Sequence, residues 1–377
     1  MEIAGVIAEY DPFHRGHELH LRRTRERADA VVCVMAGWVT QRGACACLSK
    51  FERARMALLC GADAVLELPA FFTVRPADAF ASAGCSILRD VGCDALSFGT
   101  ETDPALLARA AGIARNEPDE VRRYIRELLD GGASFAHARA QAYAAYLGTD
   151  SAALSQPNAI LACAYMAENR GAMREIAVPR EGAYHGGELS ASRVRRLVRE
   201  GRLEEAKALL PEAARPFAGA MEIRPGDAPA LFSARCAQEA YLRSLADAGE
   251  GIEHRFMRAA QAARTRGELA DGIVSSRYTR ARAQRLITQC ELGITKEKAD
   301  LAPRPAYARL LGFRRDAEAV VSEIIRRAKI PVPARAKDVP EGIVFETERR
   351  AEALFAASGS MPAPAGDAEY RQKLIVV

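Results

Sequence analysis

Short apolar runs alternate with amphipathic segments along the first part of the chain. The run Ile3–Tyr10 is apolar and ends at Asp-Pro, which is typical of a buried strand. A helix-favouring segment follows at 17–28, and a second apolar, β-branched run follows at 30–37. A strand, a helix and a second strand in this order predict a βαβ unit with parallel strands and a right-handed crossover.

The same alternation continues beyond residue 37. It predicts helices over 50–62 and 75–92, and strands over 64–69, 94–101 and 175–182. This order is typical of an α/β fold, a Rossmann-like domain with a parallel sheet. Ligands of such domains bind beyond the carboxyl ends of the strands. We therefore expect the loops at 11–17, 37–43, 99–101 and 180–185 to converge on one site.

From about residue 200 the hydrophobic period becomes helical. Helices are predicted over 201–210, 232–249, 252–273, 277–293 and 316–330. A chain of 377 residues is also longer than most domains that are built around a single hydrophobic core. We therefore predict two domains: an α/β nucleotide-binding catalytic domain over 1–205, and a mainly α-helical, basic domain over 206–377.

Composition narrows the class of protein only slightly. The hydrophobic content of 49% and the charged content of 27% are globular values. A net charge of +4 permits a polyanionic partner without requiring one. No apolar run reaches the ~18 residues of a membrane span, and the N-terminus lacks a signal pattern. We therefore expect a cytoplasmic protein with no membrane partner. The cysteines in apolar stretches are expected to be core residues, not a disulfide framework.

Three of the six histidines lie in "EYDPFHRGHELHL". His14 and His17 flank Gly16 where the first predicted helix begins. The free N–H groups of a helix N-terminus bind phosphate readily, Gly16 permits close backbone approach, and imidazoles can donate to phosphate oxygens. His20 either caps this site or faces solvent. Neither the P-loop pattern nor the dinucleotide pattern G-x-G-x-x-G is present.

Zinc is the alternative ligand for this histidine pair, since two histidines at this spacing can share a metal. The only close cysteine pair, Cys45 and Cys47, has no second pair to complement it. We therefore expect a phosphate site and no protein-bound structural metal.

The segment "DPFHRGH" resembles the H-x-G-H signature of the nucleotidyltransferase superfamily. In more detail, the chain resembles the bacterial tRNA(Met) cytidine acetate ligase family in order and over nearly its whole length. The resemblance is carried by "GVIAEYDPFHRGHELHL", "VMAGWVTQRG", "SKFERARMALLCGADAVLELP", "LSFGTE", "SQPNAILACAY", "REGAYH", "GIEHRFMRAA", "SSRYTRARAQRLITQCELGIT" and "RPAYARLLGF".

This resemblance implies an ATP-dependent ligase that forms a carbon–nitrogen bond and converts ATP to AMP and diphosphate. Acetate is expected to be activated as acetyl-adenylate. The acetyl group then passes to N4 of the wobble cytidine of elongator tRNA(Met). ATP is the expected nucleotide substrate, accompanied by Mg²⁺.

The resemblance also implies which residues contact ATP. His14 and His17 are the expected catalytic residues. The expected ATP loop comprises Ile7, Ala8, Glu9, Tyr10, Asp11, Pro12, Phe13, His14, Arg15, Gly16, His17, Glu18, Leu19 and His20. Gly99, Asn158 and Arg180 are the further expected contacts. Taken alone, these three residues could be a turn glycine, a helix cap and a solvated charge.

Three more residues are candidate phosphate contacts. Ser190 and Ser192 open a predicted helix in "LSASRVRRL", which resembles the second motif of the superfamily; a simple N-cap is the alternative. Lys50 in "LSKFERA" is the third candidate, and it could equally be a charge on a helix face.

The helical part carries a basic cluster. Residues 251–290 contain eight arginines against three acidic residues. Arginines neutralise phosphates and an aromatic ring can stack on an unpaired base, so Arg277, Tyr278, Arg280 and Arg285 are candidate tRNA contacts. A solvated helical face is the alternative, and the family resemblance favours tRNA.

The chain departs from the family pattern after the second strand. The family usually has Q-R-G-E-P, whereas this chain has "QRGAC" at 41–45. A non-catalytic, ATP-responsive tRNA-binding protein therefore remains an alternative function. A small-molecule adenylyltransferase would use the same ATP loop, but such an enzyme needs no long basic helical extension.

Overall fold

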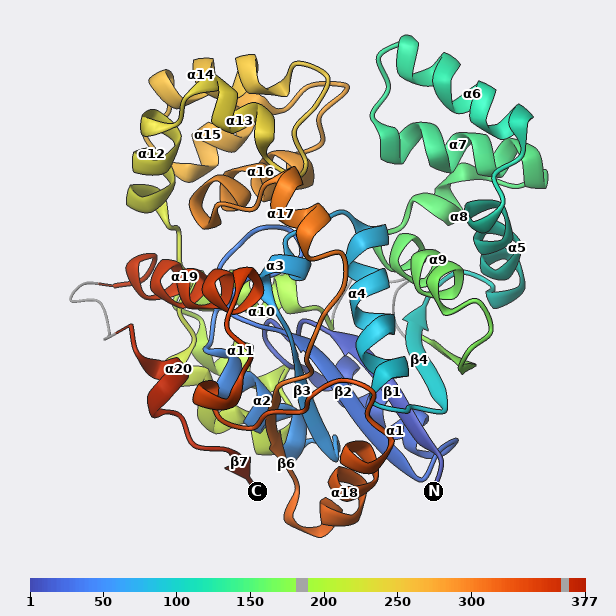
Figure 1. Ribbon diagram of the computed structural model, residues 1–377, viewed down its shortest axis with the longest axis vertical. Coiled ribbons are helices and arrows are strands. Elements are labelled where there is room, and N and C mark those ends of the chain that lie inside the picture. Colours follow the sequence, from blue (N-terminus) through green and yellow to red (C-terminus); the bar gives the residue numbers. More distant parts are fainter. Residues whose placement is uncertain (181–188, 361–365) are drawn as a thin grey trace.

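The computed structural model describes residues 1–180, 189–360 and 366–377. Its core is a seven-stranded sheet (Figure 1). The strand order is β5-β4-β1-β2-β3-β6-β7. The bounds are β1 Ile3–Ala8, β2 Ala30–Ala36, β3 Ala64–Leu68, β4 Ala95–Thr100, β5 Arg174–Pro179, β6 Leu310–Phe313 and β7 Ile375–Val376. Strands β1 to β5 are all parallel, which confirms the predicted α/β class.

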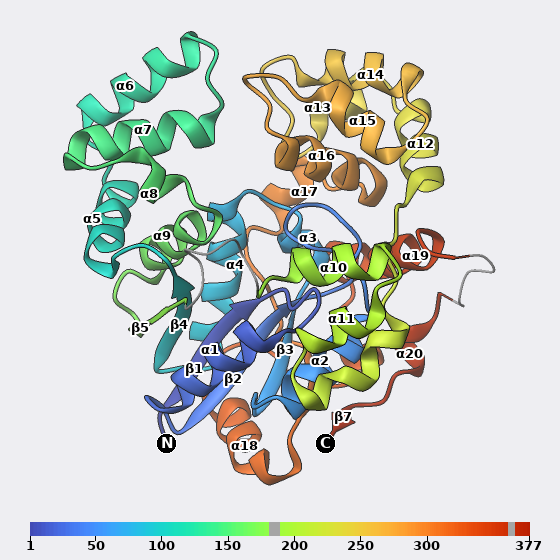
Figure 2. The same ribbon diagram turned by 180° about the vertical axis from the view of Figure 1, so that it is seen from behind.

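Helices cover both faces of this sheet, and the central strands β1, β2 and β3 are accordingly buried and apolar, except for Glu67 of β3. Helix α1 packs on one face and α4 on the other (Figures 1 and 2). A Cβ added to Gly5 of β1 would collide with the Leu88 side chain of α4, so this glycine allows close packing. The helices near the sheet are α1 Arg15–Arg25, α2 Lys50–Leu59, α3 Ala70–Thr73, α4 Ala77–Asp90, α9 Pro157–Asn169, α10 Ala191–Arg199 and α11 Leu203–Ala208.

Two groups of helices rise above the edge where the parallel strands end (Figures 1 and 2). The first is an insertion between β4 and β5 that the hydrophobic pattern did not reveal. It comprises α5 Pro104–Arg115, α6 Asp119–Asp130, α7 Phe135–Leu147 and α8 Ser151–Ser155. The second group, which we call the helical lobe, comprises α12 Asp227–Cys236, α13 Glu239–Ser244, α14 Ile252–Ala262, α15 Arg266–Ile273, α16 Arg280–Leu292 and α17 Lys296–Leu301. Residues of the lobe between 230 and 290 form a hydrophobic cluster of their own.

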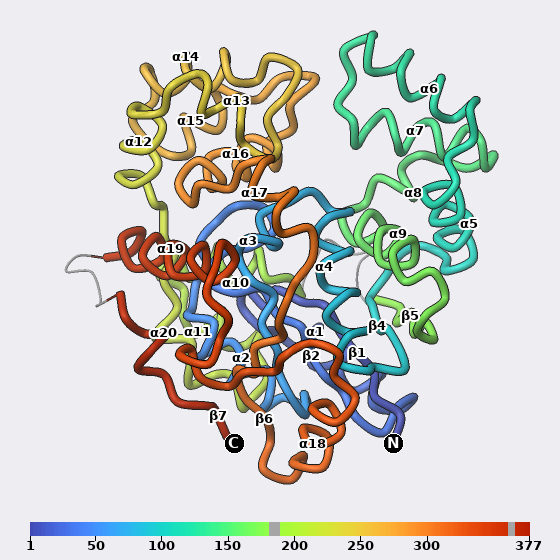
Figure 3. The backbone as a smooth tube through the Cα atoms, viewed as in Figure 1, coloured from blue at the N-terminus to red at the C-terminus, as the bar shows by residue number. Residues whose placement is uncertain are grey.

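The chain returns to the sheet after the helical lobe, as the tube in Figure 3 shows. Strand β6 pairs antiparallel with β3, and β7 pairs parallel with β6. The remaining elements are 3₁₀ helices at Glu212–Ala220, Arg315–Ala317 and Ala336–Asp338, and α-helices α18 Glu318–Arg327, α19 Ile343–Ala357 and α20 Ala368–Arg371. The predicted division between residues 205 and 206 stays a prediction, but the sheet includes strands from both sides of it. Among the described residues, no helix is long and apolar enough to cross a membrane.

Candidate active site

The loop after β1 leads into the N-terminus of α1 through a reciprocal histidine cap. His14 is the N-cap residue, and its Nδ1 accepts a hydrogen bond from the Gly16 backbone N–H at 3.0 Å. The His14 backbone N–H in turn donates to Nδ1 of His17 at 3.3 Å. A neutral imidazole whose Nδ1 accepts must carry its proton on Nε2. Both rings therefore keep an Nε2–H donor for a ligand.

Burial keeps these imidazoles neutral. Desolvation lowers the pKa of His14 to about 3, and the nearby cations Arg180 and Arg195 contribute to this lowering. The pKa of His17 is also lowered by burial, then by its neighbour His14, with which it stacks at 3.8 Å between ring centroids. Burial and Arg180 lower the pKa of His20 to about 4, and its Nε2 lies 2.9 Å from Ser97 Oγ. The site thus offers uncharged N–H donors.

We expect His14, His17 and His20 to show no imidazole titration between pH 5 and 8 in NMR spectra of the folded protein. Because the pKa values of these histidines are lower in the folded than in the unfolded protein, their contribution to folding stability is complete at pH values above the unfolded pKa of about 6.5. That stability is lost as the pH falls toward 3 to 4, the folded pKa values of His14 and His20. Protein unfolded in urea is the control, because there every imidazole should titrate near 6.5. A transition near pH 6.5 at His14 in the folded protein would contradict this assignment.

The two histidines line a cavity of about 790 Å³ at the carboxyl ends of the parallel strands. Of the expected ATP loop, the lining includes Ile7, Ala8, Glu9, Tyr10, Asp11, His14, Gly16, His17, Leu19 and His20. Pro12, Phe13, Arg15 and Glu18 are not among the lining residues; Phe13 is fully buried and Arg15 points to solvent. The cavity volume is in the range of small-molecule sites.

Gly99, Asn158 and Arg180 come together on one wall of this cavity. Glu101, two residues after Gly99, joins the other two: its Oε1 accepts from Asn158 Nδ2 at 2.6 Å and lies 3.1 Å from Arg180 Nε. The Arg180 side chain covers Gly99, where an added Cβ would lie 3.4 Å from Arg180 Cγ. Sequence reasoning did not single out Glu101. Residues 181–185 of the loop expected beside Arg180 lie outside the described residues.

The helix after this wall contributes Ser192 and Arg195 to the cavity. Arg195 Nη1 lies 3.2 Å from Asp11 Oδ2, and Asp11 Oδ1 accepts from the Cys47 backbone N–H at 2.7 Å. Ser192 Oγ accepts from Arg195 Nη2 at 3.3 Å. Ser190 is the N-cap of α10, where it accepts from the Arg193 N–H at 3.2 Å, and it does not line the cavity. Ser192, but not Ser190, thus faces the site.

Arg53 was also missed by sequence reasoning, and it connects the backbone segments that carry cavity-lining residues. This fully buried guanidinium donates to the carbonyl oxygens of Glu9, Ala36, Gly37 and Leu48. These carbonyls belong to the ends of β1 and β2 and to the loop that follows β2. Its position in an amphipathic helix gave no signal, since its partners are backbone atoms from distant segments.

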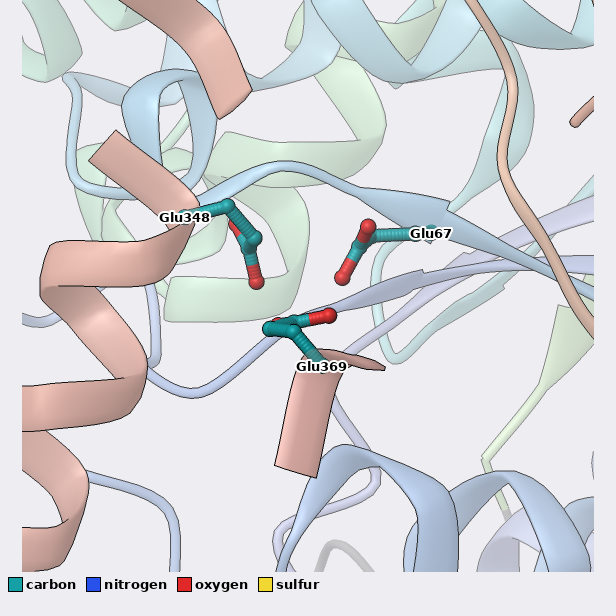
Figure 4. A group of neighbouring side chains, drawn as sticks. All are labelled: Glu67, Glu348 and Glu369. Carbon is teal, nitrogen blue, oxygen red and sulfur yellow. The ribbon is translucent and has the colours of Figure 1, made fainter. Parts of the chain in front are cut away.

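Lys50 was a candidate phosphate contact with a charge on a helix face as the alternative, and its position fits neither, since it does not line the cavity and is not exposed. Its side chain is fully buried, and its ammonium group contacts the carboxylates of Glu67, Glu348 and Glu369. Figure 4 shows these three carboxylates converging from β3, α19 and α20. They have the spacing of a metal site, but the Lys50 ammonium lies among them in place of a metal ion. Lys50 therefore joins the C-terminal helices to the sheet.

Two of the four candidate tRNA contacts, Tyr278 and Arg285, are buried or mostly buried in the helical lobe, which the sequence analysis did not predict. Tyr278 is 5% exposed, and its hydroxyl donates to the Glu250 carbonyl, so its ring belongs to the core of the helical lobe and cannot stack on a base. Arg285 is mostly buried and paired with Asp247 at 2.7 Å. Arg277 and Arg280 are exposed, although Arg280 contacts Asp271. Both errors arise because the buried face of a helix depends on packing that composition does not reveal.

The chain is similar to known proteins over nearly its whole length. The family model described as HIGH Nucleotidyl Transferase matches residues 1–365. The tRNA(Met) cytidine acetate ligase of Geobacillus sp. is 30% identical over 387 aligned positions, covering 96% of each chain. The enzyme of the same name from Acetivibrio thermocellus is 32% identical, covering 90% of this chain and 89% of the relative. The crystal structure of Thermotoga maritima TmcAL bound with alpha-thio ATP has a TM-score of 0.90 and 28% identity, and the match covers both chains fully.

Proposed function

Because the chain belongs to the tRNA(Met) cytidine acetate ligase family of HIGH nucleotidyl transferases, we propose that it is an ATP-dependent ligase that acetylates N4 of the wobble cytidine of elongator tRNA(Met). The observation that carries this proposal is the pair of neutral Nε2–H donors of His14 and His17 at the N-terminus of α1. They lie in one cavity with Asn158 and Arg180, as the residues of an ATP site should.

In the first step a carboxylate oxygen of acetate attacks the α-phosphorus of ATP. The bond from that phosphorus to the oxygen bridging to the β-phosphate breaks, and pyrophosphate leaves with the electron pair. His14, His17 and Arg180 donate to phosphate oxygens, and the N-terminus of α1 adds a partial positive charge. The protein contributes positioning and charge neutralisation, as phosphoryl and nucleotidyl transfer require.

In the second step N4 of the cytidine attacks the acetyl carbonyl carbon. The bond between that carbon and the phosphate oxygen breaks, AMP leaves, and the nitrogen loses a proton to solvent. His14 and His17 are neutral donors because burial lowers the pKa of each ring, so they are suited to hold the AMP phosphate during this step as well.

Mg²⁺ is expected to arrive with ATP as part of the substrate. The two carboxylates of the ATP loop that line the cavity are already engaged: Asp11 with Cys47 N–H and Arg195, and Glu9 with the Gln41 N–H. Burial raises the pKa of Glu9, which makes it a poorer metal ligand. The triphosphate oxygens of ATP, and not these two carboxylates, would therefore be the expected ligands of Mg²⁺.

We expect the exposed Arg277 to contact RNA phosphate. Arg277→Glu should weaken tRNA binding and make its dependence on salt concentration less steep, by about one unit of slope for each phosphate that is no longer neutralised. Filter binding at several salt concentrations measures both quantities. Arg315→Glu is the matched control, because Arg315 is also exposed but lies just before α18, at the opposite end of the sheet from the helical lobe (Figure 1). Equal effects of the two substitutions would remove Arg277 from the interface.

Mass spectrometry of tRNA nucleosides tests the function itself. Purified protein, ATP, acetate and tRNA should yield N4-acetylcytidine, and acetate should be required for exchange of label between pyrophosphate and ATP. A panel of other short carboxylates identifies the acid. A stable AMP conjugate of a small metabolite would instead indicate an adenylyltransferase, and tRNA binding without AMP release would indicate a non-catalytic protein.

A further inference from the structure

The cavity is lined by more than the ATP site. A second set of lining residues, which we call the lobe-side wall, comes from the loop after β2 and from segments near the helical lobe. It comprises residues 40–45 and 222–227, together with Arg266, Gly267, Gln284 and Ser358. Since α15 and α16 supply three of these residues, the surface of the helical lobe continues directly into the cavity that holds the histidines.

Most polar side chains of the lobe-side wall are already paired within the protein. Arg224 contacts Glu222 at 2.8 Å, and Arg266 contacts Glu291 at 2.7 Å. Thr40 and Gln41 are hydrogen-bonded to the carbonyls of Ala44 and Arg75, and Cys45 Sγ lies 3.5 Å from Ser358 Oγ. These residues build the wall, and each of their side chains has a partner within the protein, although Arg224 Nε itself has no hydrogen-bond partner among the described residues.

Arg42 and Gln284 differ from their neighbours. Among the residues that the structure describes, neither side chain has a hydrogen-bond or ion-pair partner, and both line the cavity. The backbone segments that carry them lie close together: a Cβ added to Gly43, the residue after Arg42, would be 2.6 Å from the Gln284 carbonyl oxygen. Arg42 also lies near the ATP loop, because its charge lowers the pKa of Glu9. A free guanidinium and a free amide thus stand between the ATP site and the helical lobe.

Gly43 fixes this arrangement. Its φ of +78° favours glycine, and its carbonyl accepts from Arg266 Nη2 at 3.0 Å and from Thr288 Oγ1 at 2.7 Å. The loop that carries Arg42 is therefore attached to α15 and α16, and its position follows that of the helical lobe.

We propose that the lobe-side wall holds the acceptor nucleotide of the RNA, with Arg42 at a backbone phosphate beside it and the Gln284 amide at the edge of its base. This inference rests on the proposed function, since the acceptor must reach an acyl-adenylate held at His14 and His17. The N–H groups of an amide can donate to N3 or O2 of a cytosine, both of which accept, and a guanidinium suits phosphate. Both residues act on the acceptor and not on ATP.

The test separates the two half-reactions. Arg42→Ala and Gln284→Ala should each lower kcat/KM for tRNA acetylation at least about tenfold, as expected when one polar interaction with the substrate is removed. Acetate-dependent exchange of label between pyrophosphate and ATP, measured without tRNA, should stay within about twofold of the unmodified protein. The matched controls are Arg55→Ala and Gln261→Ala, which remove the same groups from exposed positions that do not line the cavity.

Unchanged acetylation in both variants would overturn the assignment. A parallel loss of pyrophosphate exchange in folded variants would also overturn it, because it would place the two residues in the ATP site. The thermal unfolding midpoint of each variant shows whether such a loss is only misfolding. If a variant misfolds, Arg42→Lys and Gln284→Asn repeat the comparison. If the unmodified protein exchanges pyrophosphate but acetylates no tRNA, the proposed function fails instead, which is a separate result.

Discussion

Replacing His14 or His17 by alanine is expected to lower acetate-dependent exchange between pyrophosphate and ATP by about 10²–10³-fold, the loss typical of removing one donor to a developing oxyanion. Each ring presents an Nε2–H to the cavity because its Nδ1 is occupied by a backbone N–H. Binding of tRNA should survive, since the exposed arginines of the helical lobe are unchanged.

The histidine test needs a control for folding, because His14 is also a helix cap. His14→Asn keeps a side-chain acceptor at the N-cap but lacks the Nε2–H, so it should fold like the unmodified protein and still fail to exchange. His137→Ala removes an exposed histidine on α7 and should change nothing. Full exchange activity in His14→Asn would show that His14 acts only as a cap.

The second large effect is on stability. Lys50→Ala is expected to lower the free energy of unfolding by about 3–5 kcal/mol, because it removes the cation from buried Glu348 and leaves buried Glu67 and Glu369 with Arg309 alone. Urea denaturation followed by circular dichroism measures the change. Lys207→Ala is the matched control: Lys207 forms an ion pair with Glu204 on the surface, and its loss should cost less than about 1 kcal/mol. Similar losses in the two variants would contradict a structural role for the buried cluster.

Glu348 gives this cluster a defined pH dependence. Burial and the neighbouring carboxylate of Glu67 raise the pKa of Glu348 to about 8. Because the pKa of this acid is higher in the folded than in the unfolded protein, its contribution to folding stability is complete below the unfolded pKa of about 4.5. That stability is lost as the pH rises through the folded pKa of about 8. Glu348→Gln, which keeps a neutral group of similar shape, should therefore be tolerated far better than Lys50→Ala and should flatten this pH dependence.

The sequence predicted the parts of the fold that depend on local periodicity. Strands β1 to β4 and helices α1, α2 and α4 lie within a few residues of their predicted places, because each carries its own apolar pattern. His14 and His17 were singled out by their spacing around Gly16 at the start of a predicted helix, and Gly99, Asn158 and Arg180 by the family resemblance; all five line the cavity. Whether these residues bind ATP stays a prediction that the substitutions above can test.

What the sequence could not predict depends on partners far along the chain. Lys50 looked like a charge on a helix face, but two of its carboxylates are 298 and 319 residues away. The four residues of β6 are too few for a period to be recognised, and they form a strand because β3 offers an open edge. Tyr278 and Arg285 were judged by residue type, whereas burial within the helical lobe decides what they can contact.

The late position of β6 and β7 in the chain has a consequence for biosynthesis. When residues 1–205 have left the ribosome, β3 has no neighbour on its outer side, and Lys50 has only Glu67 among its three carboxylates. An open strand edge is a template for wrong pairing, so the nascent protein carries an aggregation hazard until residues 310–313 emerge. The outer edge of β3 is therefore covered only after the segments that carry His14, His17, Gly99, Asn158 and Arg180 have been synthesised.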